Sequence, residues 1–455
     1  MMESNTGKFT AEELAVARGC LKKCLEKGAD AARITLNKSC MDLVGTLNGE
    51  VDKVSHCMDR SISLIIYADG RCGSYSINRF DDKALDSFIA KAIETTKLLA
   101  KDECKTLPSP ERKAKDASSG DELALYDNDY DALDAAGRLQ KAREASIFES
   151  TAATEHEGWK LISEELEYSD CAYDTLVLDS EGLECRHSET SYDFGAEISI
   201  EDNEGRKYSG RWWHSSTFRD GLETLSCCTK ALDNAIRQIG SKSHRSGKFT
   251  MVVDSECAAR LVTPILNALS GSSIQQNNSF LLNAVGKKVF SEGMTIEDRC
   301  RRKGESGSRL FDSEGVATFE HYIIEKGTIK EYFINTYIAN KTGMSPTIED
   351  ATRPVLLPWP EKSLDRDAIL RKCRNGILVT GFNGGNSNAT TGDFSYGIEG
   401  FAFKDGKISH PVHEMLITGN FIELWNSLIA VGDDARPCMS KLIPTLAFSK
   451  VDFSG

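Results

Sequence analysis

The sequence predicts an α+β protein, with N-terminal units of helices on antiparallel sheets followed by a strand-rich C-terminal domain. Two observations predict this class. Long stretches alternate between apolar and polar residues with a period of two, which is typical of half-buried strands. Tight-turn sequences such as Asn48-Gly49 and Asp69-Gly70 separate these stretches, and strands joined by such turns pair antiparallel.

The first hundred residues predict a helix, a group of strands and a second helix. Thr10 is a suitable N-cap for a helix over residues 11–27, and Gly28 is a suitable stop. Alternation over 31–47 continues beyond a turn into a second strand, and residues 61–67 form a third strand that is strongly apolar.

A fourth strand and a helix over residues 82–100 complete this group. Residues 101–120 are charged, contain Pro and Ser and lack a period, which indicates a linker. The predicted domains are an N-terminal α+β domain (1–100), this linker (101–120), a central α+β domain (121–245) and a C-terminal strand-rich domain (246–455).

The central domain repeats the order of elements in the first. Strands over 173–179, 184–200 and 208–215 precede a helix over 222–239. The two turn glycines are 21 residues apart in the first domain and 23 apart in the second. An internal duplication would explain this similarity, and so would the general use of Asp, Asn and Gly in hairpin turns.

Strands predominate from residue 247 onward. A buried strand over 249–254 leads into a helix, hairpins follow around Gly315 and Gly327, and glycine and asparagine are concentrated over 376–400. Three more strands are predicted over 401–403, 412–417 and 444–448.

Composition excludes several classes of protein. The 455 residues include 55 Lys and Arg against 69 Asp and Glu, a net charge of −14 that argues against nucleic-acid binding. No apolar run approaches the roughly 18 residues of a membrane helix. Residues 1–10 are polar, unlike a signal peptide. The 14 cysteines form no C-x-x-C pair. We therefore expect a cytoplasmic protein with reduced thiols.

The residue types alone indicate no strong catalytic motif. H-E-x-x-H, the Walker A motif and G-x-S-x-G are absent. His410, His413 and Glu414 offer possible metal ligands, but they lie in a predicted strand, where residues three apart face opposite sides. The glycine-rich stretch over 376–400 favours turns, or close approach by a peptide that adds a strand to a sheet edge.

Several ordered motifs resemble those of the TldD/PmbA family, once called modulators of DNA gyrase. The resemblance covers nearly the whole chain, and the segments that carry it are Asp312-Ser-Glu-Gly315, Thr391-Gly-Asp-Phe-Ser-Tyr-Gly397, Pro411-Val-His-Glu-Met-Leu-Ile-Thr-Gly-Asn420, Ser279-Phe-Leu281 and Gly432-Asp-Asp434. It implies a cytoplasmic metallopeptidase or the partner subunit of one.

TldD-type members of this family carry H-E-x-x-x-H on a helix and a cysteine near the C-terminus, which together bind zinc. The corresponding helix here is 255–270, and Thr263, Pro264 and Ala268 stand in place of His, Glu and His. None of the three can bind zinc, and an interior proline costs a helix roughly 3 kcal/mol or kinks it. Cys438 lies near the family's cysteine position as a possible remnant ligand.

The chain therefore resembles the TldE/PmbA type, which lacks the zinc motif. The resemblance implies no cofactor in this chain, zinc in a TldD-like partner, and a heterodimer with that partner that degrades unfolded peptides. A homodimer is the alternative assembly for the isolated chain. The residues predicted to line a peptide groove are Gly392, Asp393, Phe394, His413 and Glu414.

Two other functions stay open at this point. One is a self-sufficient metallopeptidase with an unusual site made of His410, His413 and Cys438. The other is a binding protein without proteolytic activity that modulates gyrase or another target.

Overall fold

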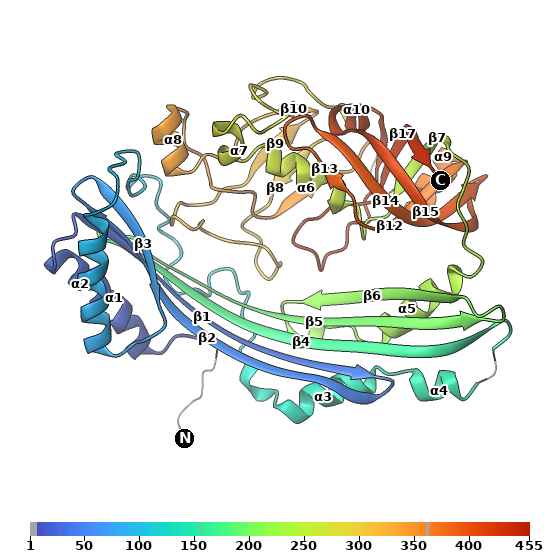
Figure 1. The fold of residues 1–455 in the computed structure, drawn as a ribbon, viewed down its shortest axis with the longest axis horizontal. Coiled ribbons are helices and arrows are strands. Elements are labelled where there is room, and N and C mark those ends of the chain that lie inside the picture. The colour runs from blue at the N-terminus through green and yellow to red at the C-terminus, as the bar shows by residue number, and fades with distance from the viewer. Residues whose placement is uncertain (1–6, 155, 361–363) are drawn as a thin grey trace. The chain divides into compact units, whose positions relative to one another are not determined.

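The computed structural model describes residues 7–154, 156–360 and 364–455 (Figure 1). The chain divides into two compact units, each built from segments that are distant in the sequence. Unit 1 comprises Met1–Ile236, Arg301–Thr318 and Ala339–Gly343, and unit 2 comprises Arg237–Cys300, Phe319–Ile338 and Met344–Gly455. Both contain helices and mainly antiparallel sheets, so the predicted α+β class is confirmed. The domain boundaries proposed from the sequence stay predictions.

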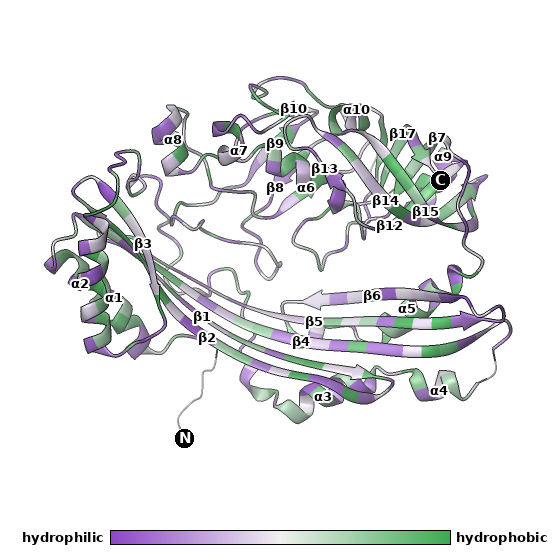
Figure 2. Cartoon of the chain, viewed as in Figure 1, coloured by the Kyte–Doolittle hydropathy of each residue, from purple (hydrophilic) through white to green (hydrophobic). Residues whose placement is uncertain are grey.

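Unit 1 contains a six-stranded antiparallel sheet with the order β3-β2-β1-β4-β5-β6. Its strands are β1 (Ala31–Leu47), β2 (Glu50–Ala68), β3 (Arg71–Ile77), β4 (Trp159–Asp179), β5 (Glu184–Asp202) and β6 (Lys207–Ser216). Because β1 pairs with β4, two strand groups that are distant in the sequence form one continuous sheet. Colours alternate along β4 and β5 in Figure 2, as expected for strands with two different faces.

The helices of unit 1 are α1 (Ala11–Glu26), α2 (Asp82–Thr96), α3 (Ala135–Glu144), α4 (Phe148–Ala152) and α5 (Leu225–Arg237), with 3₁₀ turns at Tyr130–Ala132 and Arg219–Gly221. Helix, three strands and helix thus occur twice, as α1-β1-β2-β3-α2 and as α3-α4-β4-β5-β6-α5. The repeated order predicted from the turns is confirmed.

The capping residue predicted for the first helix is also confirmed. The Glu13 amide donates to the Thr10 hydroxyl at 3.2 Å, and the Glu13 carboxylate accepts from the Thr10 amide at 2.9 Å. Helices α1 and α2 cover one end of the sheet (Figure 1). Cys20 and Cys24 are buried there, so they act as small apolar residues.

The predicted break between a second and a third strand before residue 61 is wrong, because β2 runs unbroken from Glu50 to Ala68. Residues 50–60 are exposed on both faces, whereas Ile62, Leu64 and Ile66 are buried beneath the helices. The sequence pattern changes along one strand because its surroundings change.

The segment predicted as a linker, residues 101–120, is fully described and forms no helix or strand of its own. It is nevertheless packed. Ala114 and Ala117 are buried in a cluster with Leu183, Cys185 and Phe311. Its small apolar residues therefore fix its course over the sheet.

Unit 2 contains two sheets. The larger has the order β12-β7-β17-β15-β14-β13, with β16 paired to β17. The smaller has the order β10-β9-β8-β11. The strands are β7 (Gly247–Val253), β8 (Ile296–Asp298), β9 (His321–Glu325), β10 (Thr328–Ile329), β11 (Pro354–Leu356), β12 (Gly376–Phe382), β13 (Asn386–Ser387), β14 (Asp393–Lys404), β15 (Lys407–Asn420), β16 (Leu428–Val431) and β17 (Leu446–Ser454).

The larger sheet closes on itself. Strand β12 pairs with β7 on one side and with β14 on the other, so β12, β7, β17, β15 and β14 form a closed ring. Gly400 allows this closure, since a Cβ atom there would lie 1.9 Å from the carbonyl oxygen of Leu378 on β12. Side chains including Val252, Leu378 and Phe401 form a buried core.

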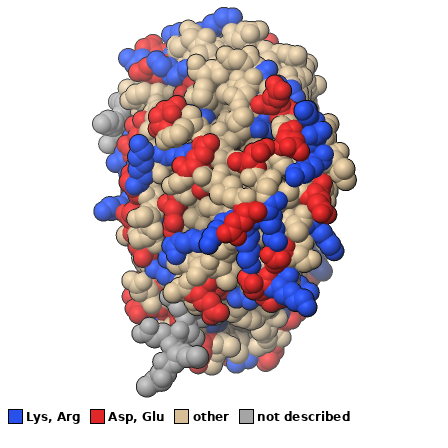
Figure 3. Space-filling view, turned by 90° about the vertical axis from the view of Figure 1, so that its left-hand side faces the viewer, with Lys and Arg blue, Asp and Glu red and all other residues tan. Residues whose placement is uncertain are grey.

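Among the described residues, the helices of unit 2 are α6 (Ala259–Ala268), α7 (Gly271–Gln275), α9 (Arg366–Cys373) and α10 (Phe421–Asn426), and α8 (Thr336–Thr342) has residues in both units. Within the described part of the chain, no helix is long and apolar enough to cross a membrane. Acidic and basic side chains are interspersed on the face shown in Figure 3.

Candidate functional site

Three segments that carry motifs meet in unit 2. They are residues 279–280, before a long loop, residues 391–394, at the start of β14, and residues 419–421, where β15 ends and α10 begins. We call their contact region the motif cluster, made of Phe280, Thr391, Gly392, Asp393, Phe394, Asn420 and Phe421.

Asn420 holds the polar part of the motif cluster together. Its side-chain amide donates to the Thr391 carbonyl at 2.8 Å and to the Asp393 carboxylate at 2.9 Å. Its side-chain oxygen accepts from the Ile422 amide at 3.0 Å, so the same residue is the N-cap of α10. One side chain therefore fixes both the turn before β14 and the start of a helix.

Asp393 is an exposed carboxylate with fixed orientation. The Thr391 hydroxyl donates to its second oxygen at 2.6 Å. The Asn420 and Thr391 side chains lower the pKa of Asp393 below its ordinary value, because both donate hydrogen bonds to the ionised form. The site thus presents a negative charge, held in place, to solvent.

The apolar part of the motif cluster consists of aromatic rings in contact with one another. The Phe394 and Phe421 ring centroids lie 4.9 Å apart, and those of Phe280 and Phe421 lie 6.0 Å apart. A Cβ atom at Gly392 would approach the Phe280 ring to 3.0 Å. Gly392 also has a φ of 80°, which glycine adopts without strain, so both its conformation and its lack of a side chain suit this position.

Helix α6 lies beside the motif cluster. The Arg260 guanidinium lies 5.0 Å from the centroid of the Tyr396 ring, which in turn stacks on Phe394 at 5.5 Å. At the other end of α6, the Ala268 carbonyl accepts from the Ser279 hydroxyl at 2.6 Å. Helix α6, which the resemblance aligns with the zinc-motif helix of TldD-type members, therefore borders the turn at 391–394.

The α6 residues that the resemblance aligns with the zinc ligands of TldD-type members do not fit a zinc ion. The Thr263 hydroxyl donates to the Ala259 carbonyl at 2.9 Å, Pro264 lies inside the helix without a donor group, and Ala268 is buried. None offers the imidazole or carboxylate that zinc needs. We therefore derive no chemical step through zinc in this chain.

His413 and Glu414 lie where β15 loses its regular alternation. The register with β14 shifts between Ile398 and Gly400, whose partners are Met415 and Val412. Glu414 has a φ of 55° and is largely exposed, as expected for a β-bulge. The strand alternation assumed for these residues is therefore wrong at this point, because the bulge turns their side chains away from a two-residue repeat.

His413 is anchored by the backbone. Its Nε2 atom lies 3.1 Å from the Ser241 carbonyl oxygen, and its Nδ1 atom lies 3.7 Å from the Glu414 carboxylate. His410 lies instead against His244, with ring centroids 5.5 Å apart. Burial and the nearby His410 lower the pKa of His244.

The three residues of the alternative metal site are not brought together. Among the described residues, one group of three or more His, Cys, Asp or Glu side chains has its donor atoms close enough to share a metal, and it does not include His410, His413 or Cys438. Where Cys438 lies, the neighbouring Asp434 is structural, since it accepts from the Arg366 amide at 2.9 Å and the Thr445 amide at 2.8 Å.

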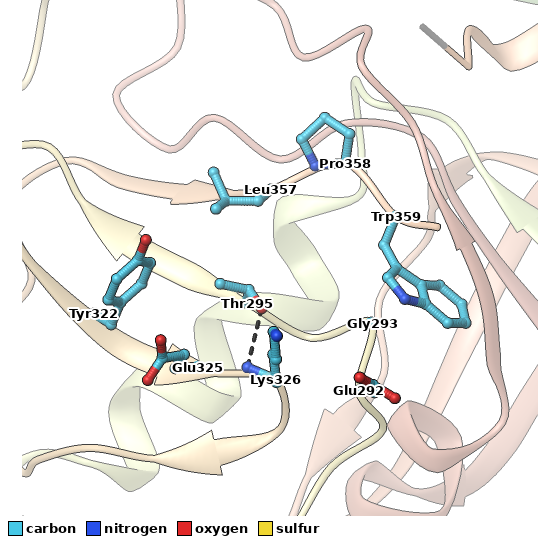
Figure 4. Close-up of a pocket in the computed structure, with 9 residues that line it drawn as sticks. All are labelled: Glu292, Gly293, Thr295, Tyr322, Glu325, Lys326, Leu357, Pro358 and Trp359. Carbon is cyan, nitrogen blue, oxygen red and sulfur yellow. Dashed lines mark hydrogen bonds between the residues drawn. The ribbon is translucent and has the colours of Figure 1, made fainter. Parts of the chain in front are cut away.

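A pocket of about 260 Å³ lies in the smaller sheet of unit 2 (Figure 4). Glu292, Glu325 and Lys326 line it together with Tyr322 and Trp359. Sequence analysis missed this pocket because its residues come from three separate segments, which are the loops at 292–295 and 357–359 and strand β9 with the turn after it, and carry no motif. Sequence analysis also missed the group of Cys40, Asp42 and His56 in unit 1, whose donor atoms lie close enough together to share a metal ion.

The fold and the motif cluster indicate a chain whose C-terminal region carries the motifs of a metallopeptidase family. Residues 246–455 match the family model described as PmbA/TldA metallopeptidase C-terminal domain. A solved structure from Bacteroides thetaiotaomicron, described as a modulator of DNA gyrase, shares 38% identity and a TM-score of 0.92, covering 98% of this chain and 100% of that chain. The chain belongs to the PmbA/TldD family.

Other relatives are more distant. The metalloprotease PmbA of Escherichia coli O157:H7 is 25% identical over 432 residues, which are 92% of each chain. The TldE structure from Thermococcus kodakarensis has 19% identity and a TM-score of 0.80, covering 97% of this chain and 100% of that chain. The last comparison supports the fold.

Proposed function

We propose that this chain is the TldE/PmbA-type subunit of a two-subunit metallopeptidase that degrades unfolded peptides. The observation that carries the proposal is the set of residue types on helix α6. By the resemblance, α6 aligns with the zinc-motif helix of TldD-type members, yet it carries Thr263, Pro264 and Ala268. A chain with this helix supplies no metal ligands there, so the zinc and the general base come from a TldD-like partner.

In this proposal the chain shapes the peptide groove. Asp393 presents a fixed charge at the surface, while the Phe394 ring and Gly392 are buried beside it. His413 and Glu414, on the bulge of β15, supply further polar contacts.

The test compares cleavage by the separate and the combined subunits. The purified chain and a TldD-like protein are each incubated with casein, alone and together. We expect no cleavage by this chain alone, and cleavage by the mixture that a chelator abolishes. Chelator-sensitive cleavage by this chain alone would overturn the proposal. Binding to gyrase without any effect on cleavage would favour the non-proteolytic alternative.

A variant pair tests the role of the groove within the complex. Asp393→Asn removes the fixed charge, and we expect slower cleavage with unchanged subunit association. Asp405→Asn is the control, since Asp405 lies in an exposed turn with a φ of 50° that asparagine also adopts. Equal cleavage activity of the two variants would show that Asp393 does not contribute to the peptide groove.

A further inference from the structure

The hairpin of β1 and β2 in unit 1 holds three different metal-ligating side chains. Cys40 and Asp42 lie two residues apart on β1 and share one face, and His56 lies opposite Asp42 on β2. The cysteine sulfur, a carboxylate oxygen and a ring nitrogen all lie within 4.8 Å of one another. Within the described residues this is the one group of its kind.

A β-bulge creates this arrangement. Near the turn, Leu47 pairs with Glu50 and Thr46 with Val51, but the register shifts between Thr46 and Gly45, after which Asp42 pairs with His56. Without the shift His56 would lie opposite Met41, on the other face of the hairpin. Since bulges re-aim side chains, this one places an imidazole beside a thiol and a carboxylate.

We propose that Cys40, Asp42 and His56 bind Zn²⁺ or a similar first-row divalent ion. Thiolate, imidazole and carboxylate are all zinc ligands, and three protein ligands leave a fourth position for water. The mixed sulfur, nitrogen and oxygen set disfavours Mg²⁺ and Ca²⁺, which prefer oxygen alone. The ion would join the two strands along the stretch of β2 that no third strand covers, since β3 pairs only from Ile62 onward.

The surrounding residues orient the carboxylate. The Nδ1 atom of His56 lies 2.8 Å from one oxygen of Asp42, and the Arg138 guanidinium lies 3.3 Å from the other. Arg138 is itself held by Asp170 at 2.7 Å. A ligand fixed by such an outer partner needs little rearrangement on binding.

The net charge of the proposed site allows a divalent ion to bind even though Arg138 lies nearby. A divalent ion with a thiolate and the Asp42 carboxylate is neutral as a group, whereas Asp42 alone carries one negative charge. The Arg138 charge is also shared with Asp170, which accepts two of its hydrogen bonds, at 2.7 Å and 3.0 Å. The bound ion therefore faces a guanidinium that is already paired.

Binding must release the thiol proton. Burial raises the pKa of the Cys40 thiol, and the charged groups that face it are Asp42, Asp170 and Arg138. His56 is more than half exposed, which opens a route for the ion from solvent. Since a metal binds the thiolate, affinity falls as the pH falls, and each ion bound releases about one proton.

The experiment titrates the full-length chain with Zn²⁺ by calorimetry and with Co²⁺ by absorption spectroscopy. We expect about one equivalent of metal and a thiolate-to-Co²⁺ charge-transfer band. His56→Gln and Cys40→Ser should each weaken binding at least about tenfold, and Cys40→Ser should abolish the band. His56 is exposed, so its variant should keep the fold even if the Cys40 variant does not.

Cys57→Ser is the matched control, because Cys57 is the adjacent residue on β2, is exposed and faces the other side of the hairpin. It should leave both signals unchanged. Absence of stoichiometric binding, a missing charge-transfer band, or equal loss in the Cys57 variant would overturn the site. These measurements involve no cleavage, so they test the metal site independently of the proposed peptidase function.

Discussion

At the scale of single residues, Asn420 stabilises both a helix end and a turn, each through a different side-chain atom. Its oxygen caps α10, and its nitrogen holds Thr391 and Asp393. Asn420→Ala removes both functions, and we expect it to lower the free energy of unfolding by about 2 kcal/mol. Asn420→Ser keeps an oxygen for the cap and should cost about half of that.

Urea denaturation of the two variants measures this difference. The serine variant should also let the pKa of Asp393 rise toward its ordinary value, because the Asn420 amide is the largest cause of its lowering. NMR titration of the carboxyl group measures that pKa. If the two variants lose the same stability, the cap of α10 contributes nothing measurable.

A second prediction at this scale concerns His321 on β9. Burial lowers the pKa of His321, but the Glu331 carboxylate 2.6 Å away and the Phe319 carbonyl raise it further than burial lowers it. A pKa raised in the folded state stabilises the fold below the unfolded value of about 6.5, and this contribution disappears as pH rises through the folded pKa.

We therefore expect the free energy of unfolding to fall as the pH rises above about 6.5, the ordinary pKa of histidine. Glu331→Gln removes the partner charge and should flatten this part of the profile. Denaturant unfolding at several pH values measures the slope. An equally steep profile in the variant would assign the pH dependence to another group.

At the scale of elements, the closed ring depends on the small size of Gly400. A methyl group there would lie 1.9 Å from the backbone oxygen of Leu378, and backbone cannot move aside as a flexible side chain can. Gly400→Ala should therefore cost about 3 kcal/mol. Gly195→Ala, in β5, is the control, since a Cβ atom there has no neighbour within 4 Å. Thermal unfolding of both variants measures the difference in stability, and equal melting temperatures would contradict the prediction.

Elements also show where sequence analysis succeeds. The start of α1 was predictable because the capping signal at Thr10 is local. The continuity of β2 was not, since burial changes along the strand while its conformation does not. His56 could not be paired with Asp42, because a two-residue turn predicts a regular register and the bulge shifts it by one residue. The groove residues Asp393 and His413 stay predictions.

At the scale of the whole molecule, the two compact units do not follow simple cuts in the sequence. Residues 301–318 belong to unit 1, although they lie inside the span of 246–455 that matches the family model. Leu310 and Phe311 pack there with Leu183 and Cys185. No local sequence pattern shows that residues 301–318 pack in unit 1, so sequence analysis could not predict it.

A fragment of residues 246–455 should therefore expose Leu310 and Phe311. We expect it to bind a hydrophobic dye more strongly than the full chain, and Leu310→Ser with Phe311→Ser should reduce that binding. Fluorescence titration with the dye measures the effect. A fragment that binds no more dye than the full chain would show that residues 301–318 find other partners.

The closed ring also sets the order of events during synthesis. Its strand β7 pairs with β17, roughly 200 residues later in the chain. All six strands of the sheet in unit 1 have been made by residue 216, so that sheet has its strands long before the ring does. Until β17 has been synthesised, one edge of β7 stays unpaired, and unpaired strand edges make a nascent chain prone to aggregation.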